Sequence, residues 1–292
     1  MLALPGQVWT GTLFSGLQQW NPQTGDLVMT IPEIEATNFF DIEFENNRLW
    51  VLASMDDSNQ AEILYVIELP QGKIVKKIPI TDEGGYGTAP TQLGSSPGKM
   101  WVNFGIVDTE TLEYMPLPNG LPSDAHFVYD DEKWMWITGS WCEGCRHDLW
   151  LVNTNDPSDY KDSQNSGALD TGVLGQPLVL ANGKVWLVAY YDSDNKSSYL
   201  DGYDIHRTDQ PKFHIDVTSE VYDHGNANIA ADNRMVWIEV EGMLHFFDSK
   251  IGQKMGELKV GEYVESIGFD GTSLWVLSSD AGLLQISLPW TP

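Results

Sequence analysis

The clearest pattern of apolar positions in this chain is a short motif with tryptophan at its centre, which recurs seven times. In each copy an aliphatic residue or Met precedes the Trp, and in all but the first an aliphatic residue follows it. The Trp residues stand about 44 residues apart on average, which is the period of a four-stranded β-propeller blade. We therefore expect seven blade anchors, at Trp9, Trp50, Trp101, Trp136, Trp186, Trp237 and Trp275.

Tight-turn residues stand two to four positions before each of these Trp residues. Asn46-Asn47 and Asn182-Gly183 are two of the seven pairs, and Asn and Gly accept the positive φ that a two-residue hairpin turn requires. An aliphatic residue also lies eight positions before each of the last six Trp residues. This pattern predicts a short inner strand, a tight turn and then the Trp strand. Because the Trp strand is apolar on both faces, we expect it to be buried between two neighbouring blades.

Two further strands are predicted downstream of each Trp strand. The clearest examples are residues 63–68 followed by 73–79, and residues 244–248 followed by 254–260. Helical periodicity of three or more turns is absent from the sequence. The predicted fold class is all-β: a seven-bladed β-propeller of four-stranded antiparallel blades. Seven blades of about 42 residues each account for the whole length, so a single propeller domain over residues 1–292 is expected.

The two ends of the chain are expected to form incomplete blades. Before Trp9 there is room for only a short inner strand, and we expect residues 1–4 to pair there on the inner edge of blade 1. After Trp275 only one more strand is evident, at residues 283–288, so blade 7 is expected to lack its outer strand. This pattern leaves open whether the chain is part of a longer protein or a larger assembly, and it does not determine the oligomeric state.

The charge balance excludes some classes of partner. The chain has 16 Lys and Arg against 42 Asp and Glu, a formal net charge of −26, whereas proteins bind nucleic acids and anionic membranes through clustered Lys and Arg. No run of 18 apolar residues occurs, so membrane insertion is not expected. The first residues lack the basic and apolar regions of a signal peptide. The compartment stays open, with an extracytoplasmic location slightly favoured.

One repeated unit of the sequence resembles a known family. The unit consists of a turn, Leu-Trp-Val, a third strand that ends in Asp or Asn, then Thr-Gly and Val-x-x-Ile-Pro. It matches best over residues 21–32, and more weakly over residues 107–112 and 247–252. This unit is similar to the YVTN-type repeat of the quinoprotein-like propeller superfamily. The resemblance covers nearly the whole chain, but it implies the fold alone.

The resemblance does not imply one activity, because propellers of this superfamily include scaffolds, surface-layer proteins, lyases and dehydrogenases. The quinoprotein dehydrogenases among them have eight blades, adjacent cysteines and a calcium ion at the cofactor. In this chain seven blades are predicted, and Cys142 and Cys145 are separated by two residues. A quinone cofactor is therefore not expected.

Ligands of propellers usually bind at the face formed by the loops that lead into the inner strands and the loops that follow the second strands. Aromatic rings beside carboxylates on this face suit sugars, peptides or cationic groups. The alternative, given even weight, is that these loop residues pack only on one another. The candidate binding residues are Tyr86, His126, Trp141, Tyr190, Tyr191, Asp192 and His224.

Cys142 and Cys145 lie in one of these loops, and three interpretations are open. A local disulfide is favoured if the protein is exported. Half of a zinc site with His147 would need a fourth ligand from elsewhere. A redox-active pair would need the start of a helix, which a propeller loop lacks.

A second candidate site lies in the central channel. Polar residues near the starts of the inner strands are able to converge there, and carboxylate and amide oxygens are ligands for a divalent cation. The simpler interpretation is a water-filled polar channel. The weak channel candidates are Asn38, Asp124, Asn226 and Glu265.

These observations favour a non-enzymatic recognition or scaffold propeller that binds a protein or a glycan through its loop face. The alternative is a metal-dependent hydrolase or lyase with its site in the central channel. No cofactor is expected for the favoured function, and the alternative would need a divalent cation.

Overall fold

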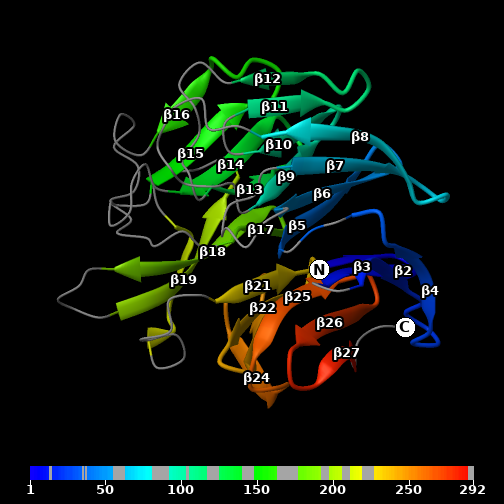
Figure 1. Ribbon diagram of the computed structural model, residues 1–292. Helices are drawn as coiled ribbons and strands as arrows, with labels where there is room; N and C mark the ends of the chain where they lie inside the picture. The colour runs from blue at the N-terminus through cyan, green and yellow to red at the C-terminus, as the bar shows by residue number, and fades with distance from the viewer. Residues whose placement is uncertain are drawn as a thin grey trace.

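The computed structural model is a ring of seven antiparallel β-sheets, each of which forms one blade (Figure 1). No helix in the described part of the chain is long and apolar enough to span a membrane. The structure describes residues 1–12, 15–34, 36, 38–54, 63–80, 92–102, 105–116, 125–139, 148–162, 177–191, 197–205, 211–218 and 227–288.

Consecutive strands are hydrogen-bonded neighbours within every blade, so each blade is one contiguous stretch of chain. Blade 1 contains β1 (Leu2–Leu4), β2 (Gln7–Thr12), β3 (Gly16–Trp20) and β4 (Leu27–Ile31). Blade 2 contains β5 (Asn38–Glu45), β6 (Arg48–Ser54), β7 (Ile63–Glu68) and β8 (Lys73–Pro79). Blade 3 contains β9 (Leu93–Ser96), β10 (Lys99–Val102), β11 (Gly105–Asp108) and β12 (Tyr114–Pro116).

The remaining four blades follow the same order. Blade 4 contains β13 (His126–Tyr129), β14 (Trp134–Gly139), β15 (Asp148–Asn153) and β16 (Tyr160–Asp162). Blade 5 contains β17 (Val179–Ala181), β18 (Lys184–Tyr191), β19 (Ser197–Asp204) and β20 (Phe213–Asp216). Blade 6 contains β21 (Asn228–Ala231), β22 (Met235–Val240), β23 (Met243–Asp248) and β24 (Lys254–Lys259). Blade 7 contains β25 (Val264–Phe269), β26 (Ser273–Ser278) and β27 (Gly282–Ser287).

The predicted fold class is confirmed, and the likeness to propellers holds at the level of the fold. The inner strand expected at the start of the chain is β1, in which Leu2 lies opposite Trp9 of β2. Blade 7 differs from the general four-stranded pattern as expected, because its sheet has three strands in the described part of the chain.

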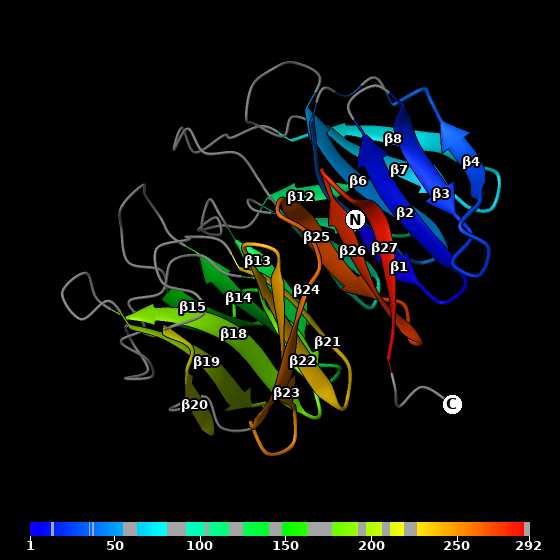
Figure 2. The same cartoon turned by 90° about the horizontal axis from the view of Figure 1, so that it is seen from below.

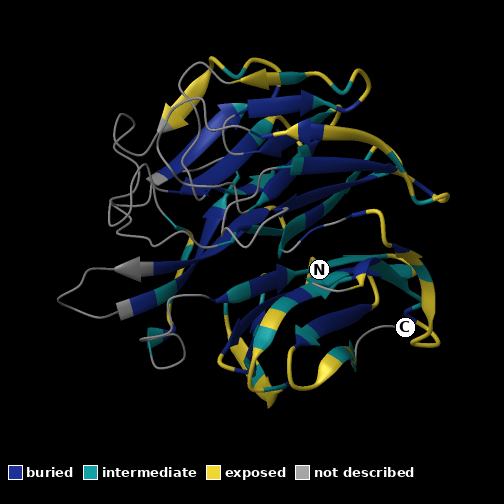
Figure 3. Cartoon of the chain, viewed as in Figure 1, coloured by how far each residue is buried: buried dark blue, intermediate teal, exposed yellow. Residues whose placement is uncertain are grey.

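Each Trp on the second strand of blades 1 to 6 is buried against the following blade. Trp9 is in one apolar cluster with Leu49 and Val51 of blade 2, and Trp237 is in another with Val276 of blade 7. Six such clusters, each spanning two consecutive blades, occur among the described residues. Figure 3 shows the same arrangement as buried middle strands and exposed outer strands. The core of the protein is therefore a series of interfaces between blades.

The interface between blade 7 and blade 1, here called the seam, is built differently. No apolar cluster of this kind spans it within the described ranges. Thr10 stands where the other blades have an aliphatic residue, and its Oγ1 accepts a hydrogen bond of 2.9 Å from Nε1 of Trp20. β1 contacts β25 across the seam (Figure 2), where a Cβ added to Gly268 would lie 3.3 Å from Cβ of Ala3.

Asp or Asn at the end of a strand organises the turn that follows it. Oδ1 of Asp108, at the end of β11, accepts hydrogen bonds of 2.9 and 2.8 Å from the backbone N–H groups two and three positions on. Asn21 and Asp248 do the same after β3 and β23. Asp270 also accepts a hydrogen bond of 2.9 Å from Nε1 of Trp275. The Asp and Asn of the repeat are therefore turn-forming residues.

Blades 3 and 4 approach each other so closely that one position accepts only glycine. A Cβ added to Gly94 on β9 would lie 2.3 Å from Cβ of Phe127 on β13, well inside van der Waals contact. Phe127 is 8% exposed and belongs to the cluster between these blades. Neither residue has room to shift, because interfaces of this kind are close-packed.

We expect Gly94→Ala to lower the free energy of unfolding by about 1–3 kcal/mol, because the added methyl group overpacks the interface. Gly256→Ala on β24 is the matched control, since its Cβ would lie 3.6 Å from the nearest atom, an ordinary contact with Phe246. Urea denaturation of the two variants and the parent protein measures the difference. Equal effects of the two substitutions would contradict the packing described.

Candidate functional site

The seven inner strands surround a central channel with two mouths. Their first residues lie at one face of the ring, here called the loop face, and their last residues lie at the opposite face, here called the turn face. A hollow lies at each mouth, and both are rich in carboxylates.

The loop-face cavity has a volume of about 510 Å³. It is formed mainly by the beginnings of the inner strands and by the end of β22. Four of its residues are glutamates, and none of the described lining residues is Lys or Arg. The lining residues are Gln92, His126, Pro177, Ala227, Asn228, Glu239, Glu241, Glu262, Tyr263, Val264 and Glu265.

Glu239 is the most deeply buried carboxylate of the loop-face cavity, at 3% exposed. Its Oε2 accepts a hydrogen bond of 2.7 Å from Nδ2 of Asn228, and its Oε1 accepts one of 2.7 Å from the N–H of Gly242. Burial raises the pKa of Glu239, although these two hydrogen bonds act in the opposite direction. This carboxyl group is held rigidly and is harder to ionise than an ordinary glutamate.

The outer rim of the loop-face cavity is formed by Glu262, Tyr263 and Glu265. Both carboxylate oxygens of Asp280 accept hydrogen bonds from the N–H of Glu262, and Oδ1 accepts one from the N–H of Tyr263. The hydroxyl group of Ser279 donates to Oε1 of Glu265. The hydrogen bonds of Asp280 hold the backbone of the rim, while Tyr263 is 67% exposed.

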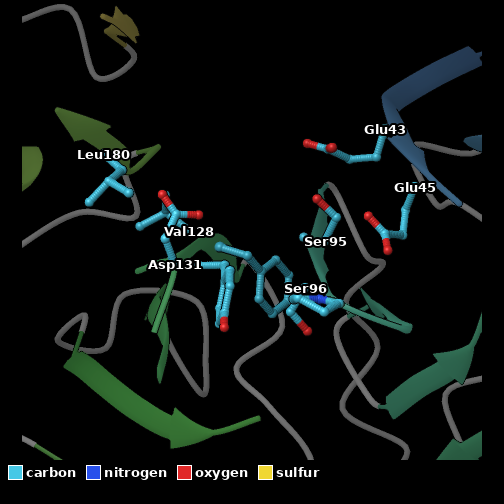
Figure 4. A pocket seen from close by; sticks show the side chains of 11 residues that line it. Glu43, Glu45, Ser95, Ser96, Val128, Asp131 and Leu180 are labelled. Atoms are coloured by element: carbon cyan, nitrogen blue, oxygen red, sulfur yellow. The ribbon is translucent and has the colours of Figure 1, made fainter. Parts of the chain in front are cut away.

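The turn-face hollow has a volume of about 440 Å³. In Figure 4, Glu43 and Glu45 lie on one side of it, Asp131 and Leu180 lie on the other, and Ser95 is placed between them. Oxygen atoms therefore line both sides of this mouth.

Glu43, which lines the turn-face hollow, has a strongly altered acidity. Burial and the neighbouring carboxyl group of Asp41 together raise its pKa to about 8, while the hydroxyl group of Ser95 acts in the opposite direction. Burial also raises the pKa of Asp41, whose Oδ2 accepts a hydrogen bond of 2.8 Å from the N–H of Leu93. Glu43 is therefore largely protonated at neutral pH.

The structure brings together some of the candidates identified in the sequence. His126 and Glu265 line the same loop-face cavity. Asn38 begins β5 opposite Ser54 and does not line either hollow. Tyr190 and Tyr191 end β18, but their side chains lie outside the described part of the structure. The other candidates lie outside the described residues altogether: Tyr86, Asp124, Trp141, Cys142, Cys145, Asp192, His224 and Asn226.

The sequence analysis did not identify Glu239 or the glutamates of the turn-face hollow as candidates, although both are marked by a pattern in the sequence. Glu239 stands two positions after Trp237 in a strand that is otherwise apolar. On β5 three acidic residues alternate with apolar ones, at Asp41, Glu43 and Glu45. Because side chains alternate between the two sides of a strand, the acidic residues of this inner strand share one side, toward the channel, and the apolar residues share the other.

The metal site of the alternative function is not visible in the described ranges. There, no group of three or more His, Cys, Asp or Glu side chains is arranged to hold a metal ion. Two of the four weak channel candidates, Asp124 and Asn226, lie outside these ranges.

We expect the stability of the protein to fall as the pH rises from about 5 to 8. The pKa of Glu43 is about 8 in the folded state against 4.5 ordinarily, so over this range the unfolded state loses the proton that the folded state keeps. The difference in the free energy of unfolding between Glu43→Gln and the parent should therefore shift in favour of the variant by at least about 1 kcal/mol when the pH is raised from 5 to 8. Urea denaturation at both pH values measures this, with the exposed Glu113→Gln as control. A constant difference between Glu43→Gln and the parent would contradict the assignment.

No protein-family model matches the chain, and no curated protein matches its sequence. Solved structures match along almost its whole length. PorZ, described as an essential bacterial surface component of the type-IX secretion system of Porphyromonas gingivalis, is 12% identical with a TM-score of 0.65. The match covers 99% of this chain and 37% of PorZ, so the chain spans little more than a third of that protein.

Two further structures are similar. The computationally designed Ika8 protein is 12% identical with a TM-score of 0.58, and the match covers 98% of this chain and 99% of that one. BamB from Moraxella catarrhalis is 9% identical with a TM-score of 0.57, and the match covers 99% of this chain and 82% of BamB. At these identities the likeness shows a shared fold, the β-propeller, and nothing of the ligand.

Proposed function

We propose that this propeller is a non-enzymatic recognition or scaffold protein that binds a partner protein through its loop face. We further propose that the loop-face cavity receives a positively charged segment of that partner. The observation that carries this proposal is the composition of the cavity. Its four glutamates and Tyr263 surround a hollow in which no described lining residue is Lys or Arg.

Electrostatics supports a cationic segment over a neutral one. Carboxylates that line a hollow with protein walls concentrate their field in it, which attracts and orients an approaching cation. The formal net charge of −26 adds long-range attraction. Complementary charge of this kind increases the rate of association and selects the partner.

The rim of the cavity offers a second type of contact. The ring of Tyr263 is exposed and lies beside Glu262 and Glu265 in the chain. An Arg or Lys side chain that approaches this rim finds an aromatic face and carboxylates together, and aromatic rings attract such cations. This combination favours a protein partner with basic side chains over an uncharged glycan.

A scaffold role agrees with one of the structural neighbours. PorZ is described as a surface component of a secretion system, and its fold is shared with this chain. The glycan partner and the metal-dependent hydrolase or lyase remain predictions from the sequence.

Penta-arginine peptide is a suitable probe for the cavity. We expect isothermal titration calorimetry to show binding that weakens at high salt. The double variant Glu262→Gln/Glu265→Gln should bind the peptide at least about fivefold more weakly, because it removes two carboxylates from the exposed rim. Glu45→Gln/Asp131→Asn, at the turn-face mouth, is the matched control and should bind as the parent does. Equal loss in both double variants would show general charge attraction and would refute the cavity as the site.

The affinity for penta-arginine should also rise with pH. Burial raises the pKa of Glu239 above that of an ordinary glutamate, so this group gains its negative charge at a higher pH than the exposed glutamates of the rim. We expect Glu239→Gln to reduce the pH dependence that calorimetry measures. An affinity that falls as the pH rises would contradict the proposal.

A further inference from the structure

Blade 7 differs from the other six blades at its outer edge. Each of those sheets has four strands, whereas β27 is the last strand of its sheet, and no strand in the described part of the chain pairs with its outer edge. Figure 1 shows β27 at the rim of the ring between β24 of blade 6 and β4 of blade 1. The place of a fourth strand is therefore bounded on both sides by the outer strands of its neighbours.

The blade 6 side of this place carries an uncovered leucine. Ile31 on β4, Ile78 on β8 and Leu258 on β24 occupy equivalent positions in their blades. Each is paired with a buried leucine on the third strand of its own blade. That leucine lies two positions before the third-strand residue that is paired with the blade's Trp. Ile31 and Ile78 are 2% and 5% exposed, and each is followed in the ring by a four-stranded blade. Leu258 is followed by blade 7 and is 42% exposed. The same position is therefore buried on β4 and β8 and partly buried at Ile215 on β20, where a four-stranded blade follows, and it is exposed on β24, where blade 7 follows.

The covering element in the complete blades is the hairpin that leads into the fourth strand. A Cβ added to Gly72, in the turn before β8, would lie 3.1 Å from Cδ1 of Ile31. In the same way, a Cβ added to Gly252, in the turn before β24, would lie 3.1 Å from Cδ1 of Ile215. These turns rest directly on the outer strand of the preceding blade.

The blade 1 side of the place is also uncovered. Gly25, in the turn before β4, corresponds to Gly72 and Gly252, but a Cβ added there would have no atom within 4 Å. Leu27 on β4 corresponds in register to Ile74 on β8. Ile74 packs against the cluster shared with blade 1, whereas Leu27 is 47% exposed. Both flanks therefore lack the same neighbour.

We propose that the outer edge of β27, with Leu27 and Leu258 on its flanks, is a slot that binds one extended segment of a partner protein as the fourth strand of blade 7. Backbone groups of β27 would pair with the segment, and the two leucines would cover its aliphatic side chains, as in other complexes formed by strand addition. The slot lies at the seam, so a bound segment would join blade 7 to blade 1.

The fourth strands of the other blades define the chemistry of the segment. β4, β8 and β24 each have an irregularity in register at the same place, between Gln19 and Trp20 in the first case. On β4 and β8 an aliphatic residue stands on each side of it, and the two side chains face opposite neighbours. On β24 the first of these positions is Lys254. The residues of β8 that do this are Ile74 and Ile78. β8 also carries Lys73, Lys76 and Lys77. A basic segment with two such aliphatic positions suits a protein with a net charge of −26.

A second copy of this chain is a poorer occupant. β27 is recessed behind β4 and β24 by the width of one strand, about 4.8 Å. Two copies approaching edge to edge would meet through these flanking strands before their β27 edges came within hydrogen-bonding distance. A single extended segment has no such obstacle.

The probe for this proposal is a synthetic peptide with the sequence of residues 71–80, labelled with a fluorophore, and its anisotropy is measured with the intact protein. The control peptide carries Ile74→Ser and Ile78→Ser and has the same charge. We expect the control peptide to bind at least about fivefold more weakly, because it loses both aliphatic contacts.

On the protein side, Leu27→Glu/Leu258→Glu should weaken binding by at least the same factor. Met115→Glu, on the equally exposed outer strand β12, should not.

Hydrogen exchange locates the bound peptide. On addition of the 71–80 peptide, we expect slower hydrogen exchange at those backbone N–H groups of β27 that are not hydrogen-bonded to β26. The variant Glu262→Gln/Glu265→Gln separates this site from the loop-face cavity and should bind the 71–80 peptide as the parent does.

Three results would overturn the proposal: equal binding of the two peptides, unchanged exchange in β27, or loss of binding in the Glu262→Gln/Glu265→Gln variant. Concentration-dependent dimerisation that Leu27→Glu/Leu258→Glu abolishes would also overturn it, since the occupant would then be a second copy. None of these results bears on the binding of penta-arginine in the cavity, so the two proposals can fail separately.

Discussion

The packing of one tryptophan from each of blades 1 to 6 against the following blade is the interaction on which the ring depends. Six of the seven indoles are completely buried, and the seventh is 3% exposed. Because the large apolar side chains are used between blades, the inner strands need none to fill the centre of the ring. Their channel-facing positions are left for polar side chains such as Glu43 and Asn228. The rigidity of the wall and the polarity of the channel thus have a single cause.

The same repeat made the fold predictable from the sequence. Trp9 and the six later copies of the motif occur once in each blade, and turn pairs such as Asn46-Asn47 mark the hairpins. The positions of the strands therefore follow from the sequence. The three-residue strand β1 and the short blade 7 followed from counting strands around Trp9 and Trp275. These features are local in sequence, which is why one sequence was sufficient.

The candidate site was less predictable, because it depends on which side chains from distant strands meet. His126 was identified as a loop-face residue and Glu265 as a channel residue, and the two line one cavity. Glu239 was missed because strand alternation does not show that its partners would be Asn228 and the N–H of Gly242. The raised pKa of Glu43 arises from the burial that the ring imposes, which no local pattern encodes.

Every blade is a contiguous stretch of chain, from the inner strand to the outer one. Among the described strands none is paired with a blade from the opposite end of the polypeptide, and β1 pairs with β2 of its own blade. Duplication or deletion of one uninterrupted segment of about 42 residues therefore adds or removes a whole blade without separating any paired strands. For a ring built in this way, the number of blades can change in evolution by single events.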